Sequence, residues 1–248
     1  MRLEASRNNK HMNDYNYKFD NYSGGGASLA STVSNTMKRV YLKMTLALIV
    51  TALTSWLAAT SQGYMTFLFS HSWFMWVLII AWFGIGIGLQ GAINKISNGV
   101  ASLLFYAFAI LNGLMLCTIF YAYSPVAIVK TFFITAATFG AMTIYGYFTS
   151  NDLSKFGNYL FYALIGLIIA SVVNIFMHSS TLDWIVSIAG VIIFVGLTAW
   201  DTQQVKQMAM VAPAGAISRL ATLGALSLYL DFVNLFLFLL RIFGGNRD

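Results

Sequence analysis

Seven long apolar runs in the sequence restrict the chain to one class of fold. Each run is close to the roughly 20 residues that a helix needs to cross about 30 Å of hydrocarbon. The runs are Val40–Ala59, Trp73–Ala92, Val100–Tyr121, Val126–Phe148, Tyr159–Met177, Trp184–Trp200 and Leu220–Ile242. The strands of a membrane β-barrel would instead alternate apolar and polar residues over about ten positions, whereas these runs are apolar on every side. The sequence therefore predicts an all-α membrane protein, a seven-transmembrane-helix bundle.

Charged residues are too few for a water-soluble domain. They make up 9% of the chain and hydrophobic residues make up 58%, whereas an ordinary soluble domain is about 25% charged. The sixth apolar run stops at Asp201, but its helical pattern continues through Met210. We therefore expect the sixth helix to extend past Asp201 and to carry this residue near one membrane face.

The first 37 residues differ from the rest of the chain in composition. They are polar, include Gly24–Gly26 and lack the apolar segment of a secretory signal. Such a segment buries too little apolar surface to fold alone. We expect a disordered tail over residues 1–37 and a transmembrane domain over residues 38–245. Two origins of Met1–His11 stay open, an expression remnant that precedes a natural start at Met12, or a natural part of the chain.

Basic residues mark one side of the expected membrane domain. They precede or open the first run, follow the second and fourth runs, and flank the connection between the sixth and the seventh: Lys38, Arg39, Lys43, Lys95, Lys155, Lys206 and Arg219. The connections on the other side, residues 61–72, 121–125 and 178–183, contain no Lys or Arg. The positive-inside rule therefore predicts a cytoplasmic N-terminus, and seven crossings place the C-terminus outside. Arg241 and Arg247 oppose this assignment, so an even number of crossings with one re-entrant segment stays as the alternative.

Two features that suggest nucleic acids or nucleotides have simpler explanations. The formal net charge is +6, but the basic residues lie at membrane borders and not on one face. Gly86, Gly88 and Gly91 match the dinucleotide pattern G-x-G-x-x-G, yet they lie inside a membrane span with no preceding strand. Gly84 and Gly88 also have the small-xxx-small spacing that allows membrane helices to approach closely. We expect helix packing there, and no nucleic-acid partner.

Metal ligands and catalytic motifs are scarce. Cys117 is the single cysteine, which excludes a disulfide and a thiolate cluster. His71 and His178 fall in the outer connections with Asp183 as the one acidic neighbour, and a zinc site there would need a further ligand. We favour interfacial histidines, no firmly bound metal and no cofactor. A Walker lysine loop and a helical H-E-x-x-H are missing from the sequence, so we do not expect an enzyme.

Asp201 and Asp231 are the two acidic residues that fall inside the expected membrane helices. An ionised carboxylate near the bilayer centre costs about 2.5–3.5 kcal/mol, so such residues usually have a function. If the two meet, both cannot be ionised cheaply and one proton is shared. Asn234 follows Asp231 on the same helical face and could support it, whereas Asn112 and Asn174 are expected to bond between helices. The alternative is that each aspartate separately reaches water or a backbone amide.

Three stretches of the sequence form a recognisable set. They are YFTSNDLSKFG (Tyr147–Gly157), FVGLTAWDTQQVK (Phe194–Lys206) and ALSLYLDFVNLFLFLLRIFGG (Ala225–Gly245). In order and in spacing they resemble the Bax inhibitor-1 family, the transmembrane Bax-inhibitor-motif proteins, and the likeness covers Lys38 to Gly245. The resemblance implies a bundle whose last helix is central and a paired-aspartate pH sensor at Asp201 and Asp231.

The resemblance also implies a latch. In bacterial members of the family this fold conducts a pH-dependent calcium leak, and a basic side chain near the inner end of the second helix holds the aspartate pair. Aligning the third run by YAFAILNG (Tyr106–Gly113) brings Lys95 to that position, where the bacterial channels carry arginine. Lysine lacks the planar fork that grips a carboxylate bidentately, so we expect a weaker or differently triggered latch. Some relatives also carry an acidic residue midway along the second helix, and Trp73–Ala92 has none.

The aspartates and the resemblance together predict a pH-sensitive calcium leak channel of the bacterial inner membrane. Its expected partners are calcium ions, bound transiently near Asp201 and Asp231, together with protons and the lipid bilayer. The alternative is a non-conducting regulator that binds a membrane protease or another stress-response partner, with the polar tail as the segment that it presents. A membrane hydrolase that uses the aspartate pair would need a nucleophile or electrophile that the sequence does not supply.

Overall fold

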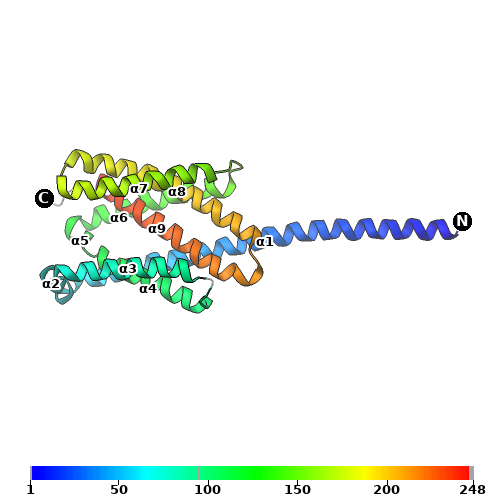
Figure 1. The fold of residues 1–248 in the computed structure, drawn as a ribbon, viewed down its shortest axis with the longest axis horizontal. Helices are drawn as coiled ribbons and strands as arrows, with labels where there is room; N and C mark the ends of the chain where they lie inside the picture. The colour runs from blue at the N-terminus through cyan, green and yellow to red at the C-terminus, as the bar shows by residue number, and fades with distance from the viewer. Residues whose placement is uncertain (1, 94, 246–248) are drawn as a thin grey trace.

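The computed structural model describes residues 2–93 and 95–245, with side chains from Ser28 onward except that of Ala214. Its helices are α1 (Arg2–Thr60), α2 (Gln62–Ser70), α3 (Ser72–Ala92), α4 (Asn98–Leu116), α5 (Ile119–Ala122), α6 (Pro125–Phe148), α7 (Ser154–Met177), α8 (Ser180–Val211), the short 3-10 helix η1 (Ala214–Ala216) and α9 (Ile217–Phe243). In the described part of the chain, seven of these helices are long and apolar enough to cross a membrane. They lie side by side as one bundle (Figure 1). The predicted all-α membrane fold is therefore confirmed.

Each predicted apolar run lies in the expected helix. The sixth continues to Val211, as the pattern through Met210 predicted. The third is divided, because α4 ends at Leu116 and the single turn of α5 follows. Ser124 caps the start of α6 by accepting a hydrogen bond from the amide of Ala127, directly before Pro125. Proline is favoured in the first turn of a helix, where its missing N–H leaves no bond unmade.

The start of the membrane domain differs from the expectation. The chain is helical from Arg2, where we expected a disordered tail to residue 37, and the first part of α1 projects beyond the bundle (Figure 1). Val33 and Met37, on one face of α1, are already buried before the apolar run that begins at Val40. Hydroxyls near this border donate to carbonyls one turn earlier, as Thr36 does to Thr32. This back-bonding satisfies polar side chains that the sequence pattern assigned to a tail.

Helix α2 was predicted to be a loop. The hydroxyl of Ser61 accepts a hydrogen bond from the amide of Tyr64 and so caps its first turn. Met65 and Leu68 are buried, and Met65 contacts the thiol of Cys117. The hydroxyl of Tyr64 donates to the carbonyl oxygen of Leu114 in α4, and burial raises the pKa of this phenol to about 12. The short helix thereby covers the end of the bundle opposite the projecting part of α1 (Figure 1).

Burial is concentrated in the last two helices. In the most apolar stretch of each span, 67% of the residues of α9 and 50% of those of α8 are buried, against 11% for α3 and α7. Helix α9 contacts α1, α4, α6 and α8. Many large apolar side chains of α3 and α7 point outward, among them Ile80, Ile87 and Phe176. Such surfaces are suited to lipid, because hydrocarbon solvates them without the penalty that water imposes.

The predicted packing of Gly84 and Gly88 is wrong within this chain. Both are exposed, and a Cβ added to either would meet nothing within 4 Å, because this face of α3 turns away from its neighbours. Gly86 lies against the ring of Phe108 instead. The close helix contacts occur elsewhere. A Cβ at Gly113 would lie 2.7 Å from the carbonyl oxygen of Thr51, so the absence of a side chain there allows α4 to cross α1 closely.

Candidate functional site: an aspartate pair between α8 and α9

Asp201 of α8 and Asp231 of α9 meet inside the bundle. Their carboxyl groups are hydrogen-bonded to each other. Asp231 is only 4% exposed, and its Oδ2 has no hydrogen-bond partner among the described residues. An ionised carboxylate only accepts hydrogen bonds. A hydrogen bond between two carboxyl groups therefore requires a proton on one of them, so this arrangement corresponds to a pair that shares a proton.

The local sequence explains why these positions meet. Helices α8 and α9 have the most extensive contact of any pair in the described structure, and the connection between them is short. On α9, Asp231 shares its buried face with Leu228 and Leu235, which lie three residues before and four residues after it. At 1.5 Å per residue, Asp201 lies roughly 15 Å from the end of α8 at Val211, and Asp231 roughly 21 Å from the start of α9. Both are therefore well inside their helices.

The two aspartates differ in access. Asp201 is partly exposed and lines a pocket of about 270 Å³, whereas Asp231 does not line it. Polar side chains from α3, α8 and α9 share this pocket, namely Gln90, Gln204 and Ser227. Amide, hydroxyl and carboxylate oxygens are ligands that calcium accepts. The pocket thus places polar side chains beside one member of the pair, while the other member is enclosed.

Lys95 and Asn234, the two residues expected to assist the pair, do not touch it here. Lys95 is exposed in the turn between α3 and α4. Lys95 forms no ion pair with either aspartate among the described side chains, so the expected latch is not formed in this conformation. Asn234 donates from Nδ2 to the carbonyl oxygen of Leu230, 2.8 Å away in its own helix.

A buried hydrogen-bond chain near the pair was not predicted as a unit. Asn112 was expected to bond between helices, and its Nδ2 donates to the hydroxyl of Tyr229 at 2.7 Å. Thr51 donates to the carbonyl oxygen of Ala109 at 2.9 Å. Its Oγ1 lies 2.7 Å from the Tyr229 hydroxyl, which must therefore be the donor between them. Three helices, α1, α4 and α9, are joined by this chain. The tyrosine two residues before Asp231 in LSLYLDF is the one sequence signal that could have indicated it.

The residues after Asp201 in the motif AWDTQQVK hold the connection between α6 and α7. Gln203 accepts a hydrogen bond from the amide of Leu153 and donates to the carbonyl oxygen of Asn151. The ammonium of Lys206 donates to the carbonyl oxygen of Tyr147 at 2.6 Å and lies over its ring. These side chains satisfy backbone groups where α6 ends and α7 begins. They fix the position of α8 beside that connection.

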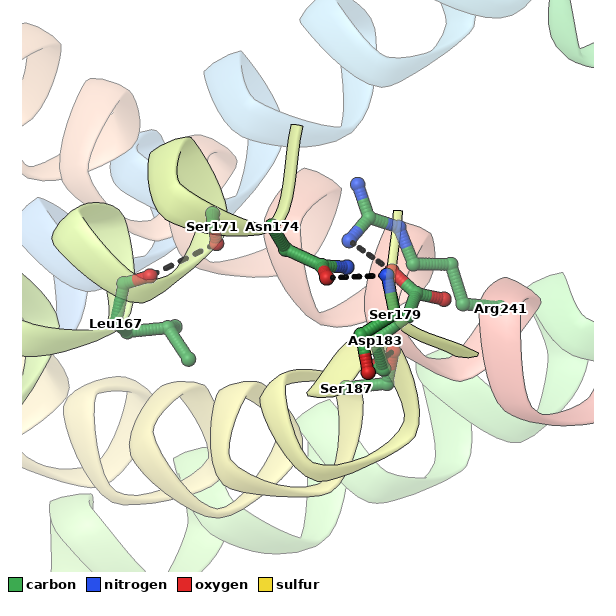
Figure 2. Close-up of polar contacts among 7 residues, drawn as sticks. All are labelled: Leu167, Ser171, Asn174, Ser179, Asp183, Ser187 and Arg241. Carbon is green, nitrogen blue, oxygen red and sulfur yellow. Dashed lines mark hydrogen bonds and ion pairs between the residues drawn. The ribbon is translucent and has the colours of Figure 1, made fainter. Parts of the chain in front are cut away.

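Arg241, which opposed the assignment by the positive-inside rule, has a charged partner at the opposite end of the bundle. Figure 2 shows Arg241 reaching from the end of α9 to Asp183 in the first turn of α8, with 3.6 Å between Nη1 and Oδ1. Asn174 was expected to bond between helices, and its Oδ1 accepts from the amide of Ser179, which closes the turn between α7 and α8. Asp183 thus pairs with an arginine. In the described residues no group of three or more His, Cys, Asp or Glu side chains could hold a metal ion.

The fold and the site together define a class, an integral membrane protein whose described residues form seven candidate membrane-spanning helices, with two carboxyl groups in contact between the two most buried of them. The sequence profile described as "Inhibitor of apoptosis-promoting Bax1" matches residues 33–248. This match includes both aspartates and Lys95. The chain therefore belongs to the Bax inhibitor-1 family, as the three motifs indicated.

Bacterial relatives share most of the chain. The inner membrane protein YbhL of Escherichia coli (strain K12) is 49% identical over 214 residues, which are 85% of this chain and 92% of that protein. A protein of Borreliella burgdorferi is 42% identical over 214 residues, with 86% and 92% covered. The protein YrjE of Lactococcus lactis is 37% identical over 247 residues, with 96% and 100% covered. The chain is thus similar over nearly its whole length to bacterial proteins, one of them of the inner membrane.

Proposed function

We propose that this protein is a pH-sensitive calcium leak channel of the bacterial inner membrane, in which Asp201 and Asp231 form the gate. The observation that carries the proposal is the hydrogen-bonded carboxyl pair, with Asp231 enclosed between α8 and α9 and Asp201 open to a polar pocket. Membrane proteins retain ionisable groups at such depth mainly on ion or proton pathways. Family membership and the inner-membrane relative support the location. The positive-inside rule places the N-terminus in the cytoplasm.

Protonation controls the contact between the two helices. With one proton shared, the hydrogen bond holds α8 against α9. When that proton leaves, both carboxyl groups are negatively charged. Each carboxylate then faces the like charge of the other. Like charges in contact repel, so the helices separate or a cation enters between them. A calcium ion fits this step because it is doubly charged and binds carboxylate oxygens.

A leak needs only a small population of the open conformation. A state about 1–3 kcal/mol above the closed one is populated at roughly a few per cent. Lys95 has a role in this scheme as a latch for a conformation in which its turn approaches Asp201. Because lysine provides a point charge without a fork, such a latch releases readily.

Calcium flux through proteoliposomes tests the proposal. We expect Asp231→Asn to abolish the pH dependence of dye-detected flux, since an amide can keep a hydrogen bond to Asp201 but cannot lose a proton. Asp152→Asn is the matched control, because Asp152 is exposed in the connection between α6 and α7, outside the membrane spans. If folded Asp231→Asn protein shows the same flux and the same pH profile as the unchanged protein, the gate assignment is wrong.

A second candidate function is regulation through a membrane partner such as a protease. The projecting part of α1 is the specific observation in its favour, because it offers a surface beyond the bundle (Figure 1). Removing residues 1–27 leaves the apolar span that begins at Ser28 intact. A regulator that presents this segment loses its function on truncation, whereas a leak retains its flux.

A further inference from the structure

A polar pocket lies where α1 enters the bundle. Its volume is about 340 Å³, and it is formed by α1 together with Gly215 of η1 and the first residues of α4 and of α9. Polar side chains from α1, α4 and α9 line it, namely Thr32, Asn35, Thr36 and Arg39 of α1, Asn98 of α4 and Ser218 of α9. Neither the aspartate pair nor any residue of the pocket beside Asp201 takes part in it.

A second polar layer lies one helical turn further along the same three helices. Lys43, Ser102 and Thr222 each follow a lining residue of the pocket by four positions. The ammonium of Lys43 donates to Ser102 Oγ and to Thr222 Oγ1, both at 2.6 Å. The two hydroxyls in turn donate to backbone carbonyl oxygens one turn earlier, those of Asn98 and Ser218. Their lone pairs are thereby directed at the ammonium group.

This part of the protein is positively charged without a negative partner on the lining. Lys43 is half-buried and is held by two neutral hydroxyls, and the Arg39 side chain is close enough to act on it electrostatically. Within the bundle, from Ser28 to Gly245, the acidic residues are Asp152, Asp183, Asp201 and Asp231. None of these lines the pocket. Two cations one turn apart repel each other, so an anion bound beside Arg39 would lower the energy of both.

We propose that this pocket binds a phosphate group. The planar fork of Arg39 suits a bidentate contact with phosphate oxygens, and the amides of Asn35 and Asn98 and the hydroxyl of Ser218 provide neutral donors around it. Basic pockets between membrane helices at the cytoplasmic side are known settings for anionic headgroups. The apolar runs at Val40, Val100 and Leu220 begin just beyond the pocket, which places it at headgroup level.

The phosphate can come from either of two sources. One is the headgroup of a phospholipid in the adjacent leaflet, and the other is a free phosphate compound from solution. In both cases the bound group joins α1, α4 and α9 at the end where α1 enters the bundle. Binding therefore stabilises the contact between these helices independently of the aspartate pair.

Two binding measurements on the purified full chain in detergent test the proposal. Native mass spectrometry compares adducts with dioleoylphosphatidylglycerol and with dioleoylglycerol, which lacks the phosphate. Thermal unfolding compares sodium phosphate with sodium chloride at equal ionic strength. The variants are Arg39→Gln and, as a matched control, Lys38→Gln, which removes the same charge from an exposed neighbour that does not line the pocket. A basic residue at a membrane surface contributes about 1 kcal/mol, so we expect Arg39→Gln to weaken phosphate binding about fivefold or more.

The outcomes separate the sources and can overturn the proposal. Phosphatidylglycerol adducts that depend on Arg39, without stabilisation by inorganic phosphate, identify a lipid headgroup. Stabilisation by inorganic phosphate that also depends on Arg39 identifies a soluble compound. Equal binding of the two lipids together with no effect of inorganic phosphate overturns the proposal, as does equal loss in Arg39→Gln and Lys38→Gln. Asn98→Leu removes a lining donor without changing charge and decides the case if Arg39→Gln does not fold, because the proposal requires it to weaken binding.

Discussion

Replacing Tyr229 by phenylalanine isolates one buried hydroxyl inside the bundle. The ring of Tyr229 packs edge-on against Phe105 and Phe108, at centroid distances of 5.8 and 6.0 Å, and phenylalanine preserves both contacts. The substitution removes the hydroxyl that accepts from Asn112 and donates to Thr51. Any loss of stability therefore reports the hydrogen bonds and not the packing.

The magnitude follows from what the substitution leaves behind. Two hydrogen bonds between membrane helices are lost, at about 0.6 kcal/mol each. Asn112 is 5% exposed, and the substitution leaves its buried amide donor without an acceptor. An unsatisfied buried donor costs about 1–3 kcal/mol, which adds to the loss of stability. We expect Tyr229→Phe to lower the free energy of unfolding by about 1–3 kcal/mol.

Reversible unfolding in mixed micelles of mild detergent and dodecyl sulfate measures this effect. Tyr162→Phe is the matched control, because Tyr162 is 68% exposed on the outer face of α7. A double-mutant cycle with Asn112→Leu should give a coupling energy of about 0.6–1.7 kcal/mol. The reasoning is refuted if Tyr229→Phe unfolds like Tyr162→Phe, or if the cycle shows no coupling.

Two further predictions concern α6 and the connection that follows it. Gly146→Ala should destabilise the protein by about 1–3 kcal/mol, because its new Cβ would collide with the carbonyl oxygen of Ala199 in α8. Gly140→Ala on the same helix is the control, because its Cβ meets nothing within 4 Å and the change should be neutral or slightly stabilising. Equal unfolding of both variants would contradict the close crossing of α6 and α8. The hydroxyl and the amide of Ser154 hold the pKa of Asp152 below its usual value. The ionised carboxyl should therefore stabilise the fold at a pH above the ordinary aspartate pKa, and this effect should be lost as the pH falls through the lowered pKa. An NMR titration of the carboxyl carbon with a midpoint at or above the ordinary aspartate pKa would contradict this.

The helices of the membrane domain could be predicted from the sequence because length and hydropathy decide them. A run of about 20 apolar residues has no stable alternative to a helix in lipid. The first turns of α1 inside the bundle and the whole of α2 were missed for a related reason. Their polar residues are satisfied locally, Thr36 by its own helix and Ser61 by the amide of Tyr64. Local hydrogen bonds of this kind do not alter mean hydropathy.

Partners across helices depend on helix rotation, which hydropathy determines poorly for a span that is apolar all round. Gly84 and Gly88 had the spacing of a packing motif but face outward, whereas Gly146 lies in a close crossing that spacing did not indicate. The residues alone left open whether Asp201 and Asp231 meet, and the pair was implied by the resemblance to the Bax inhibitor-1 family. The position of Lys95 could not be predicted, because hydropathy does not determine the conformation of the turn that carries it.

The arrangement of polar groups on α9 indicates which helix contact the proposed gate would release. Successive residues of a helix are rotated by about 100°. Thr222 and Tyr229 are seven residues apart and therefore share one face, where they bond to Lys43 of α1 and to Thr51 of α1 and Asn112 of α4. Asp231 follows Tyr229 by two residues, so it points to roughly the opposite side, towards Asp201 of α8.

Helix α9 lies between two groups of helices (Figure 1), α1 with α3 and α4 on one side and α8 with α6 and α7 on the other, and the groups also touch directly where α1 meets α8. The first side is joined to α9 by neutral hydroxyls, a phenol, an amide and an ammonium group, none of which depends on a proton shared between two acids. On the second side, the carboxyl pair is a polar contact that joins α8 to α9. Loss of the shared proton therefore weakens the contact with α8 while the contacts with α1 and α4 persist. We expect the movement that opens the protein to be a displacement of α8, with α6 and α7, relative to an α9 that stays attached to α1 and α4.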